Sequence, residues 1–254
     1  MRLGYRIDGP GDAPVLVLSP SLGTTTFLWD AQVAALAAHR RILRHDHPGH
    51  GGSPVPDGPV SVADIGAGVL ALLDGLGIER ASFCGISLGG MVGQWLGANA
   101  PERIDRLVLA CTGASLGTRQ MYEERAALVR AQGTVVTLYG ARERWFTAAF
   151  RHSPPAQRLF DALLEISPEG YAACCEAVGA FDFHGELGRV EPHALLVYGE
   201  EDPVTPPDVV DALVDGIPNA RRARIAHAAH LANVEQPEAF NAAVLTYLDE
   251  RIAA

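Results

Sequence analysis

The 254-residue chain contains no lysine, and all 20 of its basic residues are arginines. Mechanisms that use a lysine nucleophile or a lysine Schiff base are therefore excluded. Thirty acidic residues outnumber the arginines and give a formal charge of −10. Because this field repels nucleic acid and attracts no anion in general, we expect no nucleic-acid partner, and we expect any anionic ligand to find its cations locally.

Cysteine is also scarce: the chain has Cys84, Cys111 and the adjacent pair Cys174 and Cys175. Their spacing suits neither a disulfide framework nor a C-x-x-C metal site, so we expect buried thiols, a reducing compartment and no metal. Long apolar runs are missing too, because charges interrupt each one well short of the roughly 18 residues of a membrane span. With no visible export signal, we expect a cytoplasmic protein that has no membrane partner.

Short apolar runs alternate with amphipathic segments along most of the chain. We expect strands at about residues 15–18, 41–44, 81–84, 106–111, 194–198 and 223–226. Helices are expected at 29–38, 61–76 with Ser61 as N-cap, 91–98, from 207 onward and 237–252. This alternation predicts one α/β domain over residues 1–254, with a mostly parallel sheet and helices on both faces. Residues of about 116–187 are helical without strands, which predicts an inserted helical cap.

The run Gly85-Ile86-Ser87-Leu88-Gly89 matches G-x-S-x-G, the nucleophile elbow, and lies between a predicted buried strand and a helix. Small residues at both ends allow a sharp turn that holds the serine hydroxyl above the sheet. The N-terminus of the following helix favours developing negative charge. We therefore predict Ser87 as a catalytic nucleophile, and a purely structural turn is the alternative.

A serine hydroxyl hardly ionises near neutral pH, so a base and an orienting acid have to follow it in the order Ser, acid, His. Asp202 follows the strand predicted at 194–198 and is the predicted acid, and Asp182 is the next candidate. His230 lies between the last strand and the last helix, where a loop can lean over the elbow, and it is the predicted base.

Other histidines compete with this assignment. His227 is the neighbouring rival, but its position closer to the strand end indicates a structural role. The remaining histidines, including His47 and His50, are interpreted as hydrogen-bonding residues of loops.

Acyl transfer also needs N–H donors for the tetrahedral oxyanion. They are usually the amide after the nucleophile and one from the loop after an early strand. By position these are the backbone N–H groups of Leu88 and Leu22. Side-chain identity matters little at these two residues, because only the amides act.

Nearly the whole chain resembles the 3-oxoadipate enol-lactonases, members of the α/β-hydrolase superfamily. The likeness is carried by residues 19–24, 29–30, 83–90, 94–97, 143–147, 168–175, 202–207 and 230–236. The segments Glu143-Arg144-Trp145-Phe146-Thr147 and 168–175 are more discriminating, because many α/β-hydrolases share the elbow and the contexts of Asp202 and His230. Two features depart from the family pattern: Pro20 stands where Asn or His is frequent, and His47-Pro48 replaces a more usual Thr-Arg pair.

The resemblance implies hydrolysis of 3-oxoadipate enol-lactone, a small anionic ring ester, to 3-oxoadipate in aromatic-compound degradation. It implies no cofactor. The carboxylate tail of such a substrate needs a local cation, which directs attention to Arg144 and Trp145 as substrate-binding residues. A surface arginine beside a core-packing tryptophan is the alternative interpretation.

Other functions fit the same motifs. A carboxylesterase or a cofactor-free perhydrolase would carry the same three residues, and a non-catalytic binding protein can use the same scaffold. A haloalkane dehalogenase is disfavoured, because its nucleophile is a carboxylate where this chain has Ser87.

Overall fold

The computed structural model describes residues 1–250, and in this part of the chain seven strands form a single sheet. The strands are β1 (Tyr5–Asp8), β2 (Val15–Ser19), β3 (Arg41–His45), β4 (Ala81–Ile86), β5 (Ile104–Ala110), β6 (Ala194–Gly199) and β7 (Ala220–Ile225). Their order is β1-β3-β2-β4-β5-β6-β7, and every pairing except that of β1 with β3 is parallel. The predicted mostly parallel sheet is confirmed.

Strand β1 is absent from the sequence prediction. It is an antiparallel edge strand in which Tyr5 pairs with His45, and most of its residues are exposed. An edge strand of four residues that faces solvent lacks the apolar run by which the buried strands were recognised.

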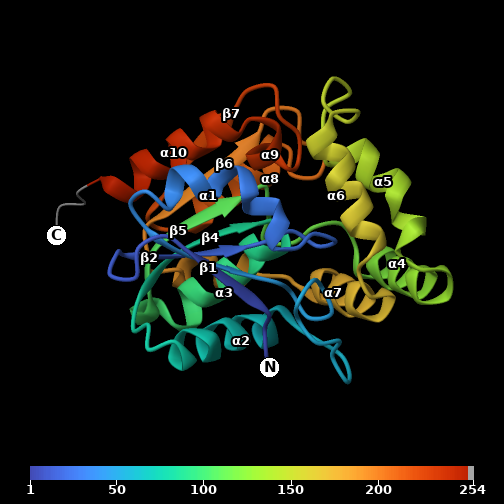
Figure 1. Ribbon diagram of the computed structural model, residues 1–254, viewed down its shortest axis with the longest axis horizontal. Coiled ribbons are helices and arrows are strands. Elements are labelled where there is room, and N and C mark those ends of the chain that lie inside the picture. Colours follow the sequence, from blue (N-terminus) through green and yellow to red (C-terminus); the bar gives the residue numbers. More distant parts are fainter. Residues whose placement is uncertain (251–254) are drawn as a thin grey trace.

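Helices cover both faces of the sheet, with α1 and α10 on one side and α2 and α3 on the other (Figure 1). The α-helices are α1 (Asp30–Leu36), α2 (Val62–Gly75), α3 (Leu88–Asn99), α4 (Arg119–Gln132), α5 (Leu138–Arg144), α6 (Pro154–Leu164), α7 (Pro168–Ala180), α8 (Pro207–Gly216), α9 (Ala232–Glu235) and α10 (Pro237–Asp249). Short 3₁₀ helices are η1 (Thr26–Trp29), η2 (Pro101–Arg103), η3 (Thr134–Thr137) and η4 (His184–Arg189). The last two residues predicted for the closing helix, 251 and 252, lie outside the described residues.

Helix α2 begins where the sequence predicts. The Ser61 hydroxyl accepts from the Asp64 N–H at 3.1 Å, and the Asp64 carboxylate accepts from the Ser61 N–H at 2.9 Å, which together form a capping box. Ile65, Val69 and Leu73 follow at helical spacing and are fully buried, so one stripe of the helix packs on the core.

Between β5 and β6 the chain forms α4, α5, α6 and α7, which we call the helical segment (residues 119–180). These helices lie together beside one end of the sheet (Figure 1). Backbone contacts join the segment to the loop after β7: the Leu231 N–H donates to the Trp145 carbonyl at 2.9 Å, and the His230 N–H donates to the Arg144 carbonyl at 3.4 Å. None of the helices found in residues 1–250 has the length and apolar character that a membrane crossing requires.

The cysteines are buried free thiols, as expected from their spacing. Burial raises the pKa of all four, that of Cys175 to about 12. Because the thiolate is the reactive form, these side chains act as small apolar groups of the core.

Three fully buried histidines, His45, His47 and His50, lie on β3 and the loop after it, and we call them the histidine cluster. Burial lowers the pKa of His45 and of His50 to about 4, and it lowers the pKa of His47 well below its ordinary value. The folded protein therefore keeps these imidazoles neutral at pH values where the unfolded chain protonates them.

Acid is expected to destabilise the fold through the histidine cluster. An unfolded histidine takes up its proton near pH 6.5, whereas the buried ring of His45 or His50 stays neutral down to about pH 4. The free energy of unfolding is therefore unaffected by these rings above pH 6.5 and falls as the pH drops from 6.5 toward 4. At 1.36 kcal/mol per pKa unit, His45 and His50 each account for about 3 kcal/mol. Burial raises the pKa of the neighbouring Asp46 carboxyl group, which offsets part of the loss at the acidic end.

Denaturant unfolding of the wild type and of His45→Phe at pH 7.0, 5.5 and 4.5 checks this expectation. The free energy of unfolding should fall with pH in both proteins, and less steeply in His45→Phe, which has one buried imidazole fewer. Equal slopes in the two proteins would contradict it.

Candidate active site

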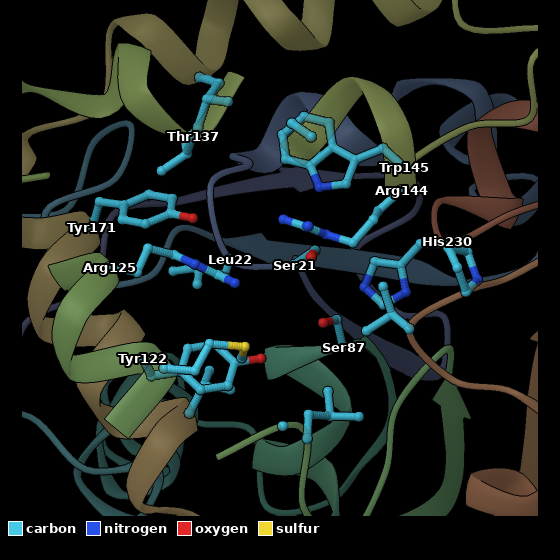
Figure 2. A pocket seen from close by; sticks show the side chains of 18 residues that line it. Ser21, Leu22, Ser87, Tyr122, Arg125, Thr137, Arg144, Trp145, Tyr171 and His230 are labelled. Atoms are coloured by element: carbon cyan, nitrogen blue, oxygen red, sulfur yellow. The ribbon is translucent and has the colours of Figure 1, made fainter. Parts of the chain in front are cut away.

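A cavity of about 270 Å³ lies between the carboxyl edge of the sheet and the helical segment. Loops after parallel strands meet at this edge, where α/β proteins usually bind ligands. Figure 2 shows the side chains that line the cavity. From the sheet side come Ser21, Leu22, Ser87, Pro203, Val204 and His230, and from the helical segment come Met121, Tyr122, Arg125, Thr137, Ala141, Arg144, Trp145, Leu163, Tyr171 and Val178.

Ser87 connects β4 to α3 in a strained backbone conformation, with φ 56° and ψ −113°. Such a conformation is costly for a residue other than glycine and persists only where its surroundings hold it. Here the Ser87 N–H donates to the Ala110 carbonyl at 2.9 Å, and its carbonyl accepts from the Thr112 hydroxyl at 2.8 Å. The turn therefore directs the Ser87 side chain into the cavity.

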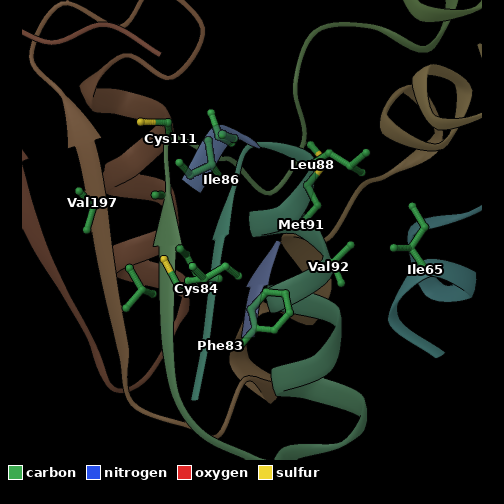
Figure 3. Packing of buried hydrophobic residues seen from close by; sticks show 14 of the residues in the cluster. Ile65, Phe83, Cys84, Ile86, Leu88, Met91, Val92, Cys111 and Val197 are labelled. Carbon is green, nitrogen blue, oxygen red and sulfur yellow. The ribbon is translucent and has the colours of Figure 1, made fainter. Parts of the chain in front are cut away.

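The two elbow glycines make this turn sterically possible. A Cβ atom on Gly85 would lie 2.1 Å from the Gly89 carbonyl oxygen, and one on Gly89 would lie 2.3 Å from the Ser19 carbonyl oxygen. Beneath the turn, Ile86, Leu88 and Met91 are fully buried where β4 meets α3 (Figure 3). The core thus anchors the turn from below.

Asp202 and His230 form a buried hydrogen-bonded pair at the same edge of the sheet. His230 Nδ1 donates to Asp202 Oδ2 at 2.9 Å. Asp202 Oδ1 accepts from the Val204 N–H at 2.8 Å, and the Thr205 hydroxyl donates to Oδ2. Burial disfavours the carboxylate, but the attraction to a protonated His230 and these hydrogen bonds outweigh it and hold the pKa of Asp202 below its usual value.

The structure brings the predicted nucleophile and base to one wall of the cavity. Figure 2 shows the Ser87 side chain beside the His230 ring. Among residues 1–250, the hydrogen bonds include none between the Ser87 hydroxyl and this ring, whose Nδ1 is occupied by Asp202. Contacts of this kind are often long before substrate binds, and the free Nε2 atom remains available for the hydroxyl.

The rival candidates lie elsewhere. Asp182 is exposed and accepts a hydrogen bond from the exposed His184 at 2.8 Å. The side chain of His227 is 84% exposed, and its Nδ1 atom lies 3.9 Å from the exposed Glu201 carboxylate. His230 lines the cavity and His227 does not, and Asp202 is the carboxylate that is hydrogen-bonded to His230, so the geometry favours Asp202 and His230.

The amides of Leu22 and Leu88 are free to donate. Within the described part of the chain, neither N–H group takes part in a hydrogen bond, whereas their neighbours Gly23 and Gly89 donate to His50 Nε2 and to the Pro20 carbonyl. Leu22 lines the cavity beside Ser87, and the Leu88 amide opens helix α3 directly after Ser87. One residue thus shares the cavity with Ser87 and the other follows it in the chain, and an unpaired N–H at both is what the predicted oxyanion site requires.

Arg144 and Trp145, at the end of α5, both line the cavity. Trp145 is buried and stacks on Phe160 with a ring-centroid distance of 5.9 Å, so it forms part of an apolar wall. Arg144 is exposed to solvent, and its guanidinium group points into the cavity (Figure 2). Gly140 leaves room for this group, because a Cβ atom there would lie 2.4 Å from Arg144 Nη2.

Arg125 on α4 is a cavity residue that sequence reasoning missed. It is half-buried, lies over the Tyr122 ring at 4.9 Å and points into the cavity opposite Arg144 (Figure 2). No Asp or Glu is among the described residues that line the cavity, and neither arginine forms an ion pair with a carboxylate of residues 1–250. These two cations can therefore bind an anionic group of a ligand.

In residues 1–250, no group of three or more His, Cys, Asp or Glu side chains is arranged to hold a metal ion. The groups that the described cavity presents to a ligand are a hydroxyl, an imidazole, backbone amides and guanidinium groups. This set of groups suits nucleophilic attack on a carbonyl carbon by Ser87.

Comparison with known proteins agrees with this geometry. A family model described as alpha/beta hydrolase fold matches residues 14–237. 3-Oxoadipate enol-lactonase 2 of Acinetobacter baylyi is 40% identical over 246 residues, which cover 96% of this chain and 92% of that protein.

Two solved structures are similar over almost their whole length. The enol-lactonase from Burkholderia xenovorans has a TM-score of 0.94 at 38% identity, over 98% of this chain and 96% of that one. A hydrolase from Pseudomonas aeruginosa has a TM-score of 0.93 at 43% identity, over 98% and 94%. The chain therefore belongs to the α/β-hydrolase family, and within it to the group that contains the 3-oxoadipate enol-lactonases.

Proposed function

We propose that the chain hydrolyses a small carboxylate-bearing lactone through Ser87, His230 and Asp202, and that the substrate is 3-oxoadipate enol-lactone. One observation carries the proposal: Ser87 and His230, which is hydrogen-bonded to the buried Asp202, line a cavity in which the described charged side chains are two arginines. The name of the Acinetobacter baylyi relative supports the choice of substrate.

Acylation begins with attack of the Ser87 hydroxyl oxygen on the lactone carbonyl carbon, while His230 Nε2 takes the hydroxyl proton. Asp202 holds the ring in the tautomer that leaves Nε2 free and stabilises the imidazolium that forms. The carbonyl oxygen becomes an oxyanion and accepts from the N–H groups of Leu22 and Leu88. When the tetrahedral intermediate collapses, the ring oxygen leaves as an enolate, which takes the proton from the His230 imidazolium and becomes the ketone, so that Nε2 is free again.

Deacylation uses the same groups with water as the nucleophile. His230 Nε2 takes a proton from water, the hydroxide attacks the acyl carbon, and the Ser87 oxygen leaves and regains a proton from His230. The product is the open dicarboxylate, 3-oxoadipate. Each step balances without a redox partner or a second substrate other than water.

The helical segment supplies the substrate-binding wall in this proposal. Trp145 and Tyr171 flank the ring of the substrate, and Arg125 and Arg144 pair with its carboxylate tail. We accordingly treat residues 1–254 as one domain in which residues of about 116–187 form a cap. The small cavity, about 270 Å³, favours a compact substrate over a long acyl chain.

Turnover by the purified protein tests the proposed function. The kcat/KM for 3-oxoadipate enol-lactone is measured against that for p-nitrophenyl acetate, a neutral ester of similar size. A clear preference for the lactone is expected, because the acetate has no group for the arginines. Comparable values would indicate a general carboxylesterase, and no hydrolysis of either compound would overturn the proposal.

Replacing either cavity arginine is expected to weaken binding of the anionic lactone selectively. A charge-assisted hydrogen bond contributes about 1.5–3 kcal/mol, so Arg125→Gln and Arg144→Gln should each raise KM roughly 10- to 100-fold for the lactone. The KM for p-nitrophenyl acetate should change by less than about threefold, because a neutral ester makes no ion pair.

Arg142→Gln is the matched control, because Arg142 lies on α5 with its guanidinium group over Phe160 and does not line the cavity. Its KM for the lactone should stay close to the wild-type value. An equal rise for the neutral ester in the Arg125 or Arg144 variant would assign that arginine to folding or to cavity shape instead.

A further inference from the structure

The histidine cluster lies beside the cavity but does not line it. The rings pack edge to face, with centroids 5.4 Å apart for His45 and His47 and 6.1 Å apart for His47 and His50. The reaction steps proposed above use none of these imidazoles. Burying three of them is costly, so their polar contacts call for an explanation.

Two members of the cluster contact the loop that follows β2. His47 Nε2 donates to the Pro20 carbonyl at 2.8 Å, and His50 Nε2 accepts from the Gly23 N–H at 3.2 Å. His50 Nδ1 lies 2.9 Å from the Pro48 carbonyl, which can only accept. The two His50 contacts together require the neutral ring with its proton on Nδ1.

Leu22, the proposed oxyanion donor, lies between the two contacted residues. The Pro20 carbonyl also accepts from the Gly89 N–H at 3.1 Å, which ties the loop to the turn that carries Ser87. Gly23 has φ +80°, a left-handed conformation that orients the peptide groups on either side of it. The Pro20 carbonyl and the Gly23 N–H belong to the peptide groups on either side of the Ser21–Leu22 peptide, so holding both fixes the direction of the Leu22 N–H bond.

The loop that carries His50 is itself held by the helical segment. A Cβ atom on Gly49 would lie 2.3 Å from Gly170 Cα, so the two backbones are in direct contact. The His50 ring stacks on Tyr171, with a centroid distance of 6.4 Å and an interplanar angle of 24°. His50 therefore has little freedom to move away from Gly23.

We propose that His50, assisted by His47, is a positioning residue that holds the Leu22 N–H group where the oxyanion forms. This inference rests on the proposed function, because it gives the Leu22 amide a role in catalysis. It adds residues to the machinery that neither contact the substrate nor exchange a proton with it.

The physical reason lies in the timing of the charge. The carbonyl oxygen gains its full negative charge only in the transition state, so donors that are already aligned stabilise that state without reorganising. A neutral imidazole supplies an acceptor for Gly23 and a donor for Pro48 from one rigid ring. Loosening the loop should therefore lower kcat and leave substrate binding almost unchanged.

Two substitutions at His50 separate its contacts. The longer amide side chain of His50→Gln places an oxygen near the position of Nε2, where it can accept from Gly23. The shorter one of His50→Asn reaches only the position of Nδ1 and leaves the Gly23 N–H without an acceptor. Both variants keep a small polar side chain, so they differ mainly in the contact of interest.

We expect His50→Asn to lower kcat for the enol-lactone about 10- to 100-fold, less than the loss on deleting an oxyanion donor outright, with KM changed by less than about threefold. His50→Gln should recover most of that loss. Labelling of Ser87 by a fluorophosphonate should slow in parallel, because its phosphoryl oxygen occupies the oxyanion position.

Equal kcat values for the two His50 variants, or labelling of His50→Asn at the wild-type rate, would overturn the inference. Should His50→Asn fail to fold, the pair His47→Gln and His47→Leu repeats the test, since only Gln retains an N–H donor for Pro20. Equal kcat values in that pair would overturn the inference too. A wild-type protein that neither turns over the lactone nor reacts with the fluorophosphonate would overturn the proposed function itself.

Discussion

Replacing Ser87 with alanine is expected to lower kcat for lactone and ester hydrolysis by about 10⁶-fold, the loss that follows removal of the nucleophile in serine hydrolases. The variant loses the atom that forms the acyl-enzyme, so that only oxyanion stabilisation and substrate binding remain to assist attack by water. KM should change little, because the hydroxyl contributes little to ground-state binding. Single-turnover and steady-state kinetics on the enol-lactone measure the loss.

Ser82→Ala is the control for this experiment, because Ser82 is a buried serine on β4, the strand that leads to Ser87, and does not line the cavity. It should keep most of the wild-type kcat. A fluorophosphonate should label the wild type and Ser82→Ala and should leave Ser87→Ala unlabelled. If Ser87→Ala retained a tenth of the wild-type activity, another nucleophile would have to be found.

The second large effect is expected at Asp202. Asp202→Asn should lower kcat by about 10⁴-fold, because an asparagine amide can donate to His230 Nδ1 and so favours the tautomer with its proton on Nε2. That tautomer cannot take the Ser87 proton. The buried carboxylate accepts from His230, Thr205 and Val204, so the substituted amide also leaves hydrogen-bond partners mismatched.

Asp182→Asn separates this effect from a general loss of acidic charge, because Asp182 is exposed and lies away from the cavity. Its kcat should remain within about twofold of the wild type, as expected for a surface substitution. Similar losses in the two variants, or a small loss in Asp202→Asn, would contradict the assignment of the acid.

Sequence reasoning predicted Ser87, Asp202 and His230 as one site because each follows a predicted strand. In a parallel sheet the carboxyl ends of the strands meet at one edge, so position along the chain predicts proximity in space. The elbow adds a local steric signal, since the glycines at 85 and 89 are needed by backbone contacts within the turn and with β2.

Arg125 was harder to find because its role depends on how α4 packs. Helical spacing does place Arg125 beside the stripe of Tyr122, Ala126 and Val129, which are all buried in the structure. An arginine at the border of a buried stripe could have been noted as a candidate binding residue. The sequence contains no information on whether that border faces solvent or a cavity.

The two departures from the enol-lactonase pattern turned out to be connected. Pro20 and His47 are 27 residues apart in the chain, and the His47 ring donates to the Pro20 carbonyl. Sequence reasoning treated them separately. The interpretation of His47 and His50 as hydrogen-bonding loop residues is confirmed, but their partners became visible only in the folded chain.

The junction between the helical segment and the loop after β7 has a consequence for how selectivity can evolve in this chain. The Glu235 carboxylate accepts from the Ala229 N–H at 2.9 Å and from the Thr147 N–H at 3.1 Å, next to the backbone bond between Leu231 and Trp145. The Glu235 carboxylate thus joins Ala229, which precedes His230, to Thr147, which follows Trp145 by two residues. We therefore expect mutations that reshape the helical segment for a bulkier ester to move the backbone next to His230, the proposed base, so that substrate range and proton transfer change together.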